Sequence, residues 1–283
     1  MQMPEGRTIR RTFLGTWLAA GVLATGYAVL VSGCTPVTPV TPVVEPLAPS
    51  GEIDGLEKAE QAWRAREIAE HEPIWEEENG PDGDPFAAGI AAYHLASATL
   101  DSSWSNEAIE AFDKVLAGNP DFALARAWRG SAHALMARDY PLRGLWQIVP
   151  GPGFVRLYHV RAAFSDLDSA VDAAPTDPVI RLIRASTYVA MPPVFGGREE
   201  GLADFDMLQG WIRDPDGNPG FSDLLRSPDW RVRYYLSRSR AMTAAGEHDD
   251  AARSWQRLAE EATDDSILRE LANWHRISLD ASR

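Results

Sequence analysis

Apolar residues recur along this chain at steps of four and then three residues, a spacing that places them on one face of a helix. The clearest copy is NEAIEAFDKVLAGNP (residues 106–120), where Ala108, Phe112 and Val115 form the apolar stripe and Pro120 follows the helix end. Three further copies keep this spacing: Ala163, Leu167 and Ala170; Gly201, Phe205 and Leu208; and Ala251, Trp255 and Leu258. The small first residue lets a partner helix approach closely. Four copies predict an array of paired helices.

Helical periodicity also precedes and follows these copies. It predicts a leading helix over 52–70, and the first hairpin is expected from Pro85–Leu100 and Asn106–Gly118. A terminal helix over Ile267–Ser278 is expected to turn Leu271 and Trp274 inward and cap the array.

Residues 71–84, HEPIWEEENGPDGD, are acidic and end in turn-forming residues, so they are predicted to form a loop. The carboxylates lack the alternating ligand spacing and the closing glutamate of a calcium loop. We therefore interpret them as a solvated acidic segment.

The helix pairs resemble tetratricopeptide (TPR) repeats. In the 34-residue register of that family, the matching positions are Leu95, Ala96, Ala108, Phe112 and Pro120 in the first unit; Gly130, Ala163, Leu167, Ala170 and Pro175 in the second; Ala185, Tyr188, Gly201 and Phe205 in the third; and Ser239, Gly246, Ala251 and Trp255 in the fourth. The resemblance covers about residues 85–261. It implies an all-α fold, a right-handed superhelical array of about four TPR-like helix hairpins with irregular insertions.

The repeat spacing is uneven. The small residues at 108, 163, 201 and 251 are 55, 38 and 50 residues apart, which leaves extra segments of 21, 4 and 16 residues over the family's 34. The largest lies near 138–158 and is rich in aromatic residues, including Trp146, Phe154 and Tyr158. It is either a lid or binding arm, or a loop that folds back and completes the core. The core interpretation is favoured because burial hides tryptophan from water. The other two segments are 191–197, with two prolines and two glycines, and 210–229.

The first 34 residues have the pattern of an export signal. A positive end (Arg7, Arg10 and Arg11) precedes an apolar run from Phe13 to Val31, and small residues lead to Cys34, the sole cysteine. This segment resembles the lipobox of bacterial lipoproteins. The resemblance implies cleavage after Gly33 and acylation of Cys34, by which the protein would be held on a membrane.

Arg10 and Arg11 also resemble a twin-arginine export motif. Ile9 stands where that family usually has a small polar residue, and no lysine follows Leu14, so twin-arginine export and ordinary secretion both stay open. Thr35 is not the aspartate that marks inner-membrane retention in enteric lipoproteins, which favours a periplasm-facing site on the outer membrane.

Residues 35–51, TPVTPVTPVVEPLAPSG, carry proline at about every third position and are expected to form an extended tether. The chain is therefore divided into a signal peptide (1–33), a lipidated Cys34 with its tether (34–51), a leading helix with an acidic loop (52–84), and a repeat domain with a capping helix (85–283).

Composition narrows the function classes. The 41 acidic and 27 basic residues give a net charge of −14, which makes nucleic acid an unfavourable partner. The six histidines are distributed one per element without an i, i+4 pair of histidines, and no GxSxG or phosphate-binding motif is present. No catalytic, cofactor-binding or metal-binding residue is predicted, and an enzyme is not expected.

The TPR resemblance implies a partner-binding surface on the leading helices. By position it would expose Tyr93, Ser97, Ala127, Ser131, Leu182 and Ser186, although ordinary helix packing explains the same residues equally well. With the aromatic insertion, the candidate partner-binding residues are Tyr93, Ser97, Ser131, Trp146, Phe154 and Tyr158.

These features predict a membrane-anchored lipoprotein of the cell envelope, a non-enzymatic scaffold for a protein or peptide partner. The alternative is an accessory small-ligand-binding component of a periplasmic TRAP-type transport system. The stretch from Gly196–Gly197 into REEGLADFDML resembles the T component of such transporters. That alternative requires a pocket beneath the 138–158 insertion.

Overall fold

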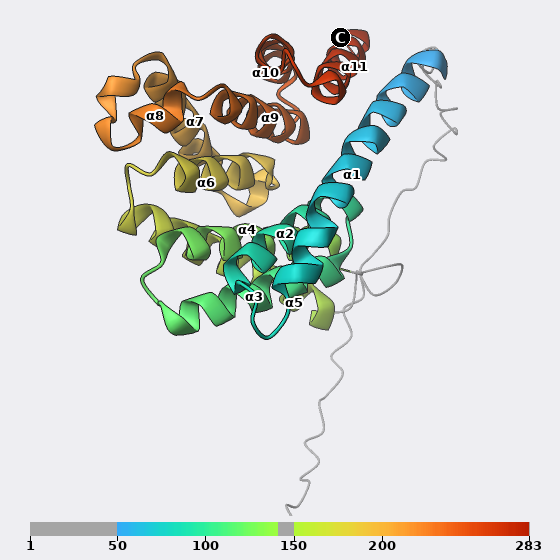
Figure 1. Cartoon of the computed structure of the whole chain (residues 1–283). Helices are drawn as coiled ribbons and strands as arrows, with labels where there is room; N and C mark the ends of the chain where they lie inside the picture. Colours follow the sequence, from blue (N-terminus) through green and yellow to red (C-terminus); the bar gives the residue numbers. More distant parts are fainter. Residues whose placement is uncertain (1–49, 141–149, 283) are drawn as a thin grey trace, which may run out of the picture. The chain divides into compact units, whose positions relative to one another are not determined.

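The regular elements of this protein are helices throughout the residues that the computed structural model describes, 50–140 and 150–282. Figure 1 shows them in sequence order: α1 (Ser50–Glu78), α2 (Pro85–Thr99), α3 (Ser102–Gly118), α4 (Ala123–Asp139), α5 (Pro150–Ala173), α6 (Pro178–Ala190), α7 (Arg198–Arg213), α8 (Ser222–Arg226), α9 (Pro228–Ala244), α10 (His248–Glu261) and α11 (Ser266–Ala281). The all-α class is confirmed.

Four hairpins form the array: α2 with α3, α4 with α5, α6 with α7, and α9 with α10. Their leading helices also pack on one another in the order α2, α4, α6 and α9. This arrangement confirms the predicted array of about four helix hairpins.

Aspartate side chains cap the N-termini of α2, α3, α6 and α11. Asp177 Oδ1 accepts hydrogen bonds from the backbone N–H groups of Val179 (2.8 Å) and Ile180 (3.2 Å), and Asp84 caps α2 in the same way. Pro178 follows its cap at the first helical turn, where no N–H is needed. The starts of α2 and α6 therefore have a local cause in the sequence. Helix α3 begins at Ser102, four residues before the predicted Asn106.

The repeated apolar stripe is the core of the array. Phe112, Leu167, Phe205 and Trp255, its bulky second positions, are at most 1% exposed. The small positions allow close packing: a Cβ placed on Gly130 would lie 2.9 Å from Leu167 Cγ. The stripe is therefore buried as predicted, apart from Val115, which is partly buried. Packing between helices holds each hairpin together.

Helix α1 is longer than predicted. The acidic residues 71–78 are helical, and only 79–84 form a turn before α2. Pro73 lies inside the helix, where it lacks an N–H donor. Tertiary contacts override this local penalty: Trp75 packs edge-on against Trp104 of α3, with ring centroids 4.9 Å apart.

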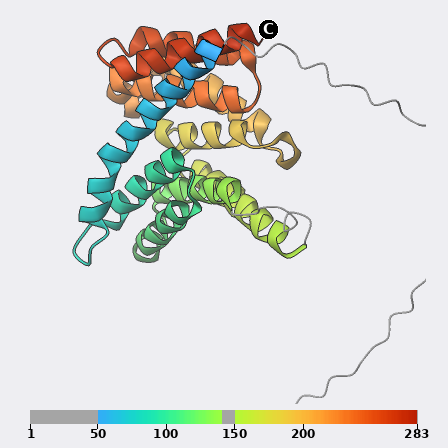
Figure 2. The same ribbon diagram turned by 90° about the vertical axis from the view of Figure 1, so that its right-hand side faces the viewer.

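Helix α1 packs against α2 and also against α11, so it contacts both the first hairpin and the terminal helix (Figure 2). Ala59 and Trp63 on α1 are buried in the apolar cluster that also contains Leu271. Arg240 of α9 lies over the Trp63 ring, 3.7 Å from its centroid. At α11, Leu271 is fully buried and Trp274 is partly buried, as expected for a cap.

The three extra segments differ in structure. Residues 141–149 lie outside the described residues, whereas 150–158 form the first turns of α5. The second segment contains a 3₁₀ turn, η2 (Pro193–Phe195), followed by Gly196 and Gly197, both at positive φ. The third, predicted over 210–229, is shorter, because α7 continues to Arg213 and α9 begins at Pro228. It contains η3 (Pro215–Gly217), η4 (Pro219–Phe221) and α8.

The predicted export signal (Arg10, Arg11), Cys34 and nearly all of the tether fall in residues 1–49, outside the described part of the chain. Within the described ranges, no helix combines the length and the apolar character that crossing a bilayer requires.

Candidate functional site

The predicted face on the leading helices is largely a packed interface. Ser131 Oγ donates a hydrogen bond to Tyr93 Oη (3.0 Å) and lies 3.0 Å from Thr187 Oγ1, so three hydroxyl groups connect α2, α4 and α6. Ser131 is 3% exposed, and Ala127 and Leu182 are buried as well. The packing alternative therefore applies to these residues. Ser97 of α2 is half-buried.

The aromatic insertion behaves differently. Phe154 and Tyr158 are 67% and 63% exposed, so the favoured interpretation of this segment as core filler is wrong for these two residues. Trp146 lies outside the described residues. Phe154, Tyr158 and the exposed Arg161 follow one another at i, i+4 and i+7 on α5. This spacing places them on one face of the helix.

Two histidines meet beside this face. His133 Nδ1 of α4 lies 2.9 Å from His159 Nδ1 of α5, and Tyr158 packs edge-on against both rings. One Nδ1 must donate and the other accept. Burial, assisted by the neighbouring His159, lowers the pKa of His133 to about 4. His133 is therefore neutral at neutral pH.

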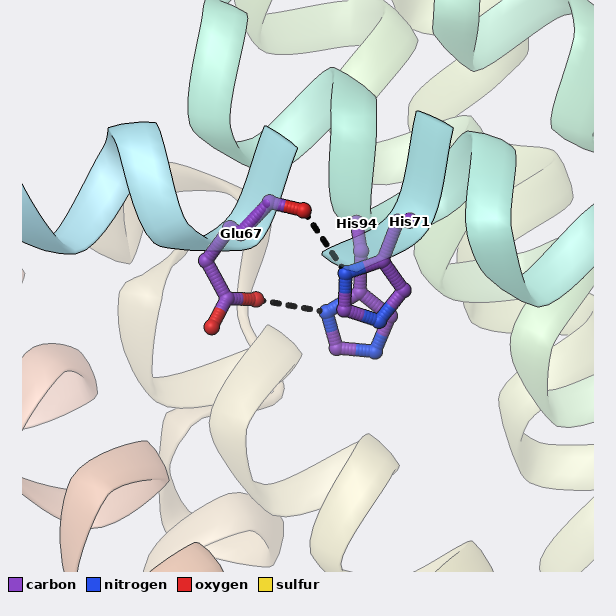
Figure 3. A group of neighbouring side chains, drawn as sticks. All are labelled: Glu67, His71 and His94. Atoms are coloured by element: carbon purple, nitrogen blue, oxygen red, sulfur yellow. Dashed lines mark hydrogen bonds and ion pairs between the residues drawn. The ribbon is translucent and has the colours of Figure 1, made fainter. Parts of the chain in front are cut away.

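A second cluster forms where α1 packs on α2. Glu67 and His71 are four residues apart on α1, and His94 reaches them from α2 (Figure 3). His71 Nδ1 lies 2.8 Å from the backbone oxygen of Glu67, and His94 Nδ1 lies 3.1 Å from Glu67 Oε2. The two imidazole rings stack, with centroids 4.1 Å apart and planes 13° from parallel.

The hydrogen bonds of this cluster define its protonation. A carbonyl oxygen can only accept, so His71 must carry its proton on Nδ1, and the carboxylate of Glu67 favours the same tautomer for His94. Burial and the nearby His94 lower the pKa of His71. Burial alone would raise the pKa of Glu67, but the hydrogen bond from His94 and the charges of His94, His71 and Arg66 lower it. The cluster thus holds a carboxylate beside a neutral imidazole of His71.

Sequence reasoning missed both histidine clusters. Two histidines at i, i+4 on one helix would have been a signal in the sequence, whereas here each pair joins two helices that lie next to each other. The Glu67–His71 spacing was a usable signal, because residues four apart share a helix face. Nothing in the sequence placed His94 on that face.

A repeated set of ion pairs was also missed. Arg129 Nε and Nη2 donate to Asp166 at 2.7 and 2.8 Å, and Arg184 Nε and Nη2 donate to Asp204 at 2.7 and 3.0 Å. Each arginine also contacts the preceding hairpin, through Asp113 or Asp168. The sequence contained a signal for these ion pairs, because an arginine stands directly before the small residue of each of these two leading helices: Arg129 before Gly130, and Arg184 before Ala185. Asp166 and Asp204 are therefore structural partners of arginine.

A pocket of about 220 Å³ lies between the turn after α1 and the helices α2 and α3, where Ala88, Ala111 and Lys114 line it. It is not formed by residues of the 138–158 insertion, beneath which the small-ligand alternative placed its binding site.

Comparisons with known proteins give few relatives. No known family model matches the chain, and no curated protein matches it. A solved structure similar to it is the crystal structure of a thermophilic TPR protein from Thermus thermophilus. The two are 18% identical with a TM-score of 0.46, over 80% of this chain and 99% of that one.

Proposed function

We propose that this protein is a membrane-anchored lipoprotein whose helical array serves as a non-enzymatic scaffold for a protein or peptide partner in the cell envelope. Anchoring through Cys34 rests on the lipobox-like sequence. Partner binding rests on the exposed face of α5, which Phe154, Tyr158 and Arg161 share.

The composition of this face supports a protein partner. Exposed aromatic and arginine side chains are enriched at the centres of protein interfaces, where they contribute most of the binding energy. Phe154 and Tyr158 each leave more than 60% of their surface to water, although the same helix buries Leu167 and Ala170 completely. Arg161 forms no ion pair among the described residues, so its guanidinium is available to an acidic group.

A site-specific cross-linker tests the proposal. The full-length protein would carry a photoreactive amino acid in place of Tyr158, and irradiated cells would be analysed for covalent adducts. We expect one dominant adduct, with its yield reduced several-fold by Phe154→Asp or Arg161→Glu.

Met207 of α7 provides the matched control, because it is 41% exposed on a different helix. A cross-linker at Met207 should give little of the adduct. Equal yields at both positions, or an adduct insensitive to Phe154→Asp and Arg161→Glu, would contradict a binding surface on α5.

A further inference from the structure

We propose that Glu67, His71 and His94 bind a divalent transition metal ion, such as Zn²⁺, between α1 and α2. One ligand atom of each side chain lies within 4.8 Å of the other two. Among the described residues, this is the one group of three such side chains that is close enough to share an ion.

Both imidazole rings present Nδ1 toward Glu67. Both Nδ1 atoms contact Glu67, one at its backbone oxygen and the other at its carboxylate, so the two nitrogens lie on the same side of the stacked rings (Figure 3). Neutral imidazole and carboxylate are ligands that Zn²⁺ prefers. Two imidazoles and one carboxylate leave a fourth position for water or for a group from a partner.

Metal binding requires each ring to move its proton from Nδ1 to Nε2. Neither Nε2 has a hydrogen-bond partner among the described residues, so each can carry the proton without breaking another contact. The ion then replaces two hydrogen bonds to Glu67, one from Nδ1 of His71 and one from Nδ1 of His94.

The rings must also turn, because their planes are nearly parallel and a bound ion has to lie close to the plane of each ring. His94 has the freedom to do so, since 27% of its side chain is exposed. Glu67 is held more firmly, with a side chain only 11% exposed. The carboxylate therefore forms the fixed part of the site, and the imidazoles close on the ion.

Zinc titration of the untagged full-length protein in detergent, after removal of metals with a chelator, tests this site. Calorimetry should detect one Zn²⁺ per chain with a Kd in the micromolar range or below. His71→Gln and His94→Gln should each weaken binding by about 10–100-fold. Glu67→Gln keeps an oxygen near His94 but removes the charge, and should weaken binding about tenfold.

Two controls separate this site from other histidines. His248→Gln changes an exposed histidine of α10, and the double variant His133→Gln/His159→Gln removes the other histidine pair. Both should bind Zn²⁺ as the unchanged protein does. Circular dichroism of each metal-free variant checks that the helices are intact.

A fold-independent readout uses Co²⁺ in the unchanged protein, where coordination by imidazole nitrogen gives visible absorption bands. Absence of these bands, or no Zn²⁺ binding up to about 1 mM, would overturn the proposal. So would one Zn²⁺ per chain bound with unchanged affinity by both His71→Gln and His94→Gln.

Discussion

The carboxylate of Asp204 is buried in the interior of the helical array. It is 1% exposed and accepts hydrogen bonds from Arg181 and Arg184, whose side chains are 12% and 14% exposed. A buried charge is tolerated only while its partners remain. This carboxylate therefore fixes how α6 packs on α7.

Asp204→Asn should lower the free energy of unfolding by about 3–5 kcal/mol, because it leaves two arginines without their buried counter-charge. Urea denaturation followed by circular dichroism measures the change. Asp113→Asn is the matched control: its carboxylate also pairs with an arginine of the array, Arg129, but its side chain is 56% exposed, so its loss should cost about 0–1 kcal/mol. Similar losses for both variants would show that burial does not determine the effect.

Phe112→Ala should cost about 3–5 kcal/mol, because the ring is fully buried and its removal leaves a cavity between α2 and α3. Thermal and urea unfolding would measure it, with Ile277→Ala, at a position 41% exposed, as the reference. A loss under about 0.5 kcal/mol for Phe112→Ala would place the ring in solvent and contradict the assigned register.

The burial of a single residue was predictable where the helical spacing repeats. It was not predictable where burial depends on contacts with segments distant in the sequence. Phe112, Leu167 and Trp255 follow the period and are buried as predicted. Phe154 and Tyr158 belong to an insertion with no repeated partner, and their exposure depends on where α5 begins. The packing of Ser131 against Tyr93 depends on contacts between separate hairpins, which a single helix pattern does not contain.

At the scale of whole helices, α1 departs most from expectation. Its acidic end and Pro73 locally favour a loop, and the helix extends to Glu78 because Trp75 and His71 find partners on α3 and α2. The four hairpins were predictable, since each carries its own apolar stripe. The docking of α1 depends on residues about 200 positions away, such as Asp265, to which Arg66 donates a hydrogen bond.

The contact between α1 and α11 should make stability depend on acid pH. Glu60 accepts a hydrogen bond from His275 Nε2 at 2.7 Å and from Arg240 at 3.2 Å. Burial would raise the pKa of Glu60, but these partners outweigh it and lower the pKa from 4.5 to about 2. Because the folded protein holds the carboxylate ionised, this stabilisation is present above pH 4.5 and is lost as the pH falls toward 2.

Glu60→Gln should therefore reduce the free energy of unfolding at pH 7 by about 1–2 kcal/mol, a figure that allows for solvent screening. The difference from the unchanged protein should shrink through pH 4.5 and vanish near pH 2. Urea midpoints across this range measure it, with Glu57→Gln, an exposed position on the same helix, as the control. A difference that stays constant with pH would contradict the role assigned to the Glu60 carboxylate.

At the scale of the whole molecule, the proposed attachment to the membrane depends on one group, the thiol of Cys34. Cys34→Ala should leave an uncut precursor that no fatty-acid probe labels, because the acylated thiol and the new amino terminus are both absent. Metabolic labelling and gel mobility measure this outcome. Arg10→Lys/Arg11→Lys serves as a comparison: loss of export would favour the twin-arginine route. Normal labelling of the Cys34→Ala protein would end the lipoprotein hypothesis.

The pairing of α1 with α11 also affects the order of folding. In a linear repeat array each unit contacts only its neighbours, so folding can begin anywhere and proceed along the chain. Here Glu60 and His275 are 215 residues apart, and closing so long a loop is slow. The hairpins can form as they are synthesised, whereas α1, although made before them, completes its docking only after the last helix exists. Until then the apolar side of α1, with Ala59 and Trp63, stays open to water or to a chaperone.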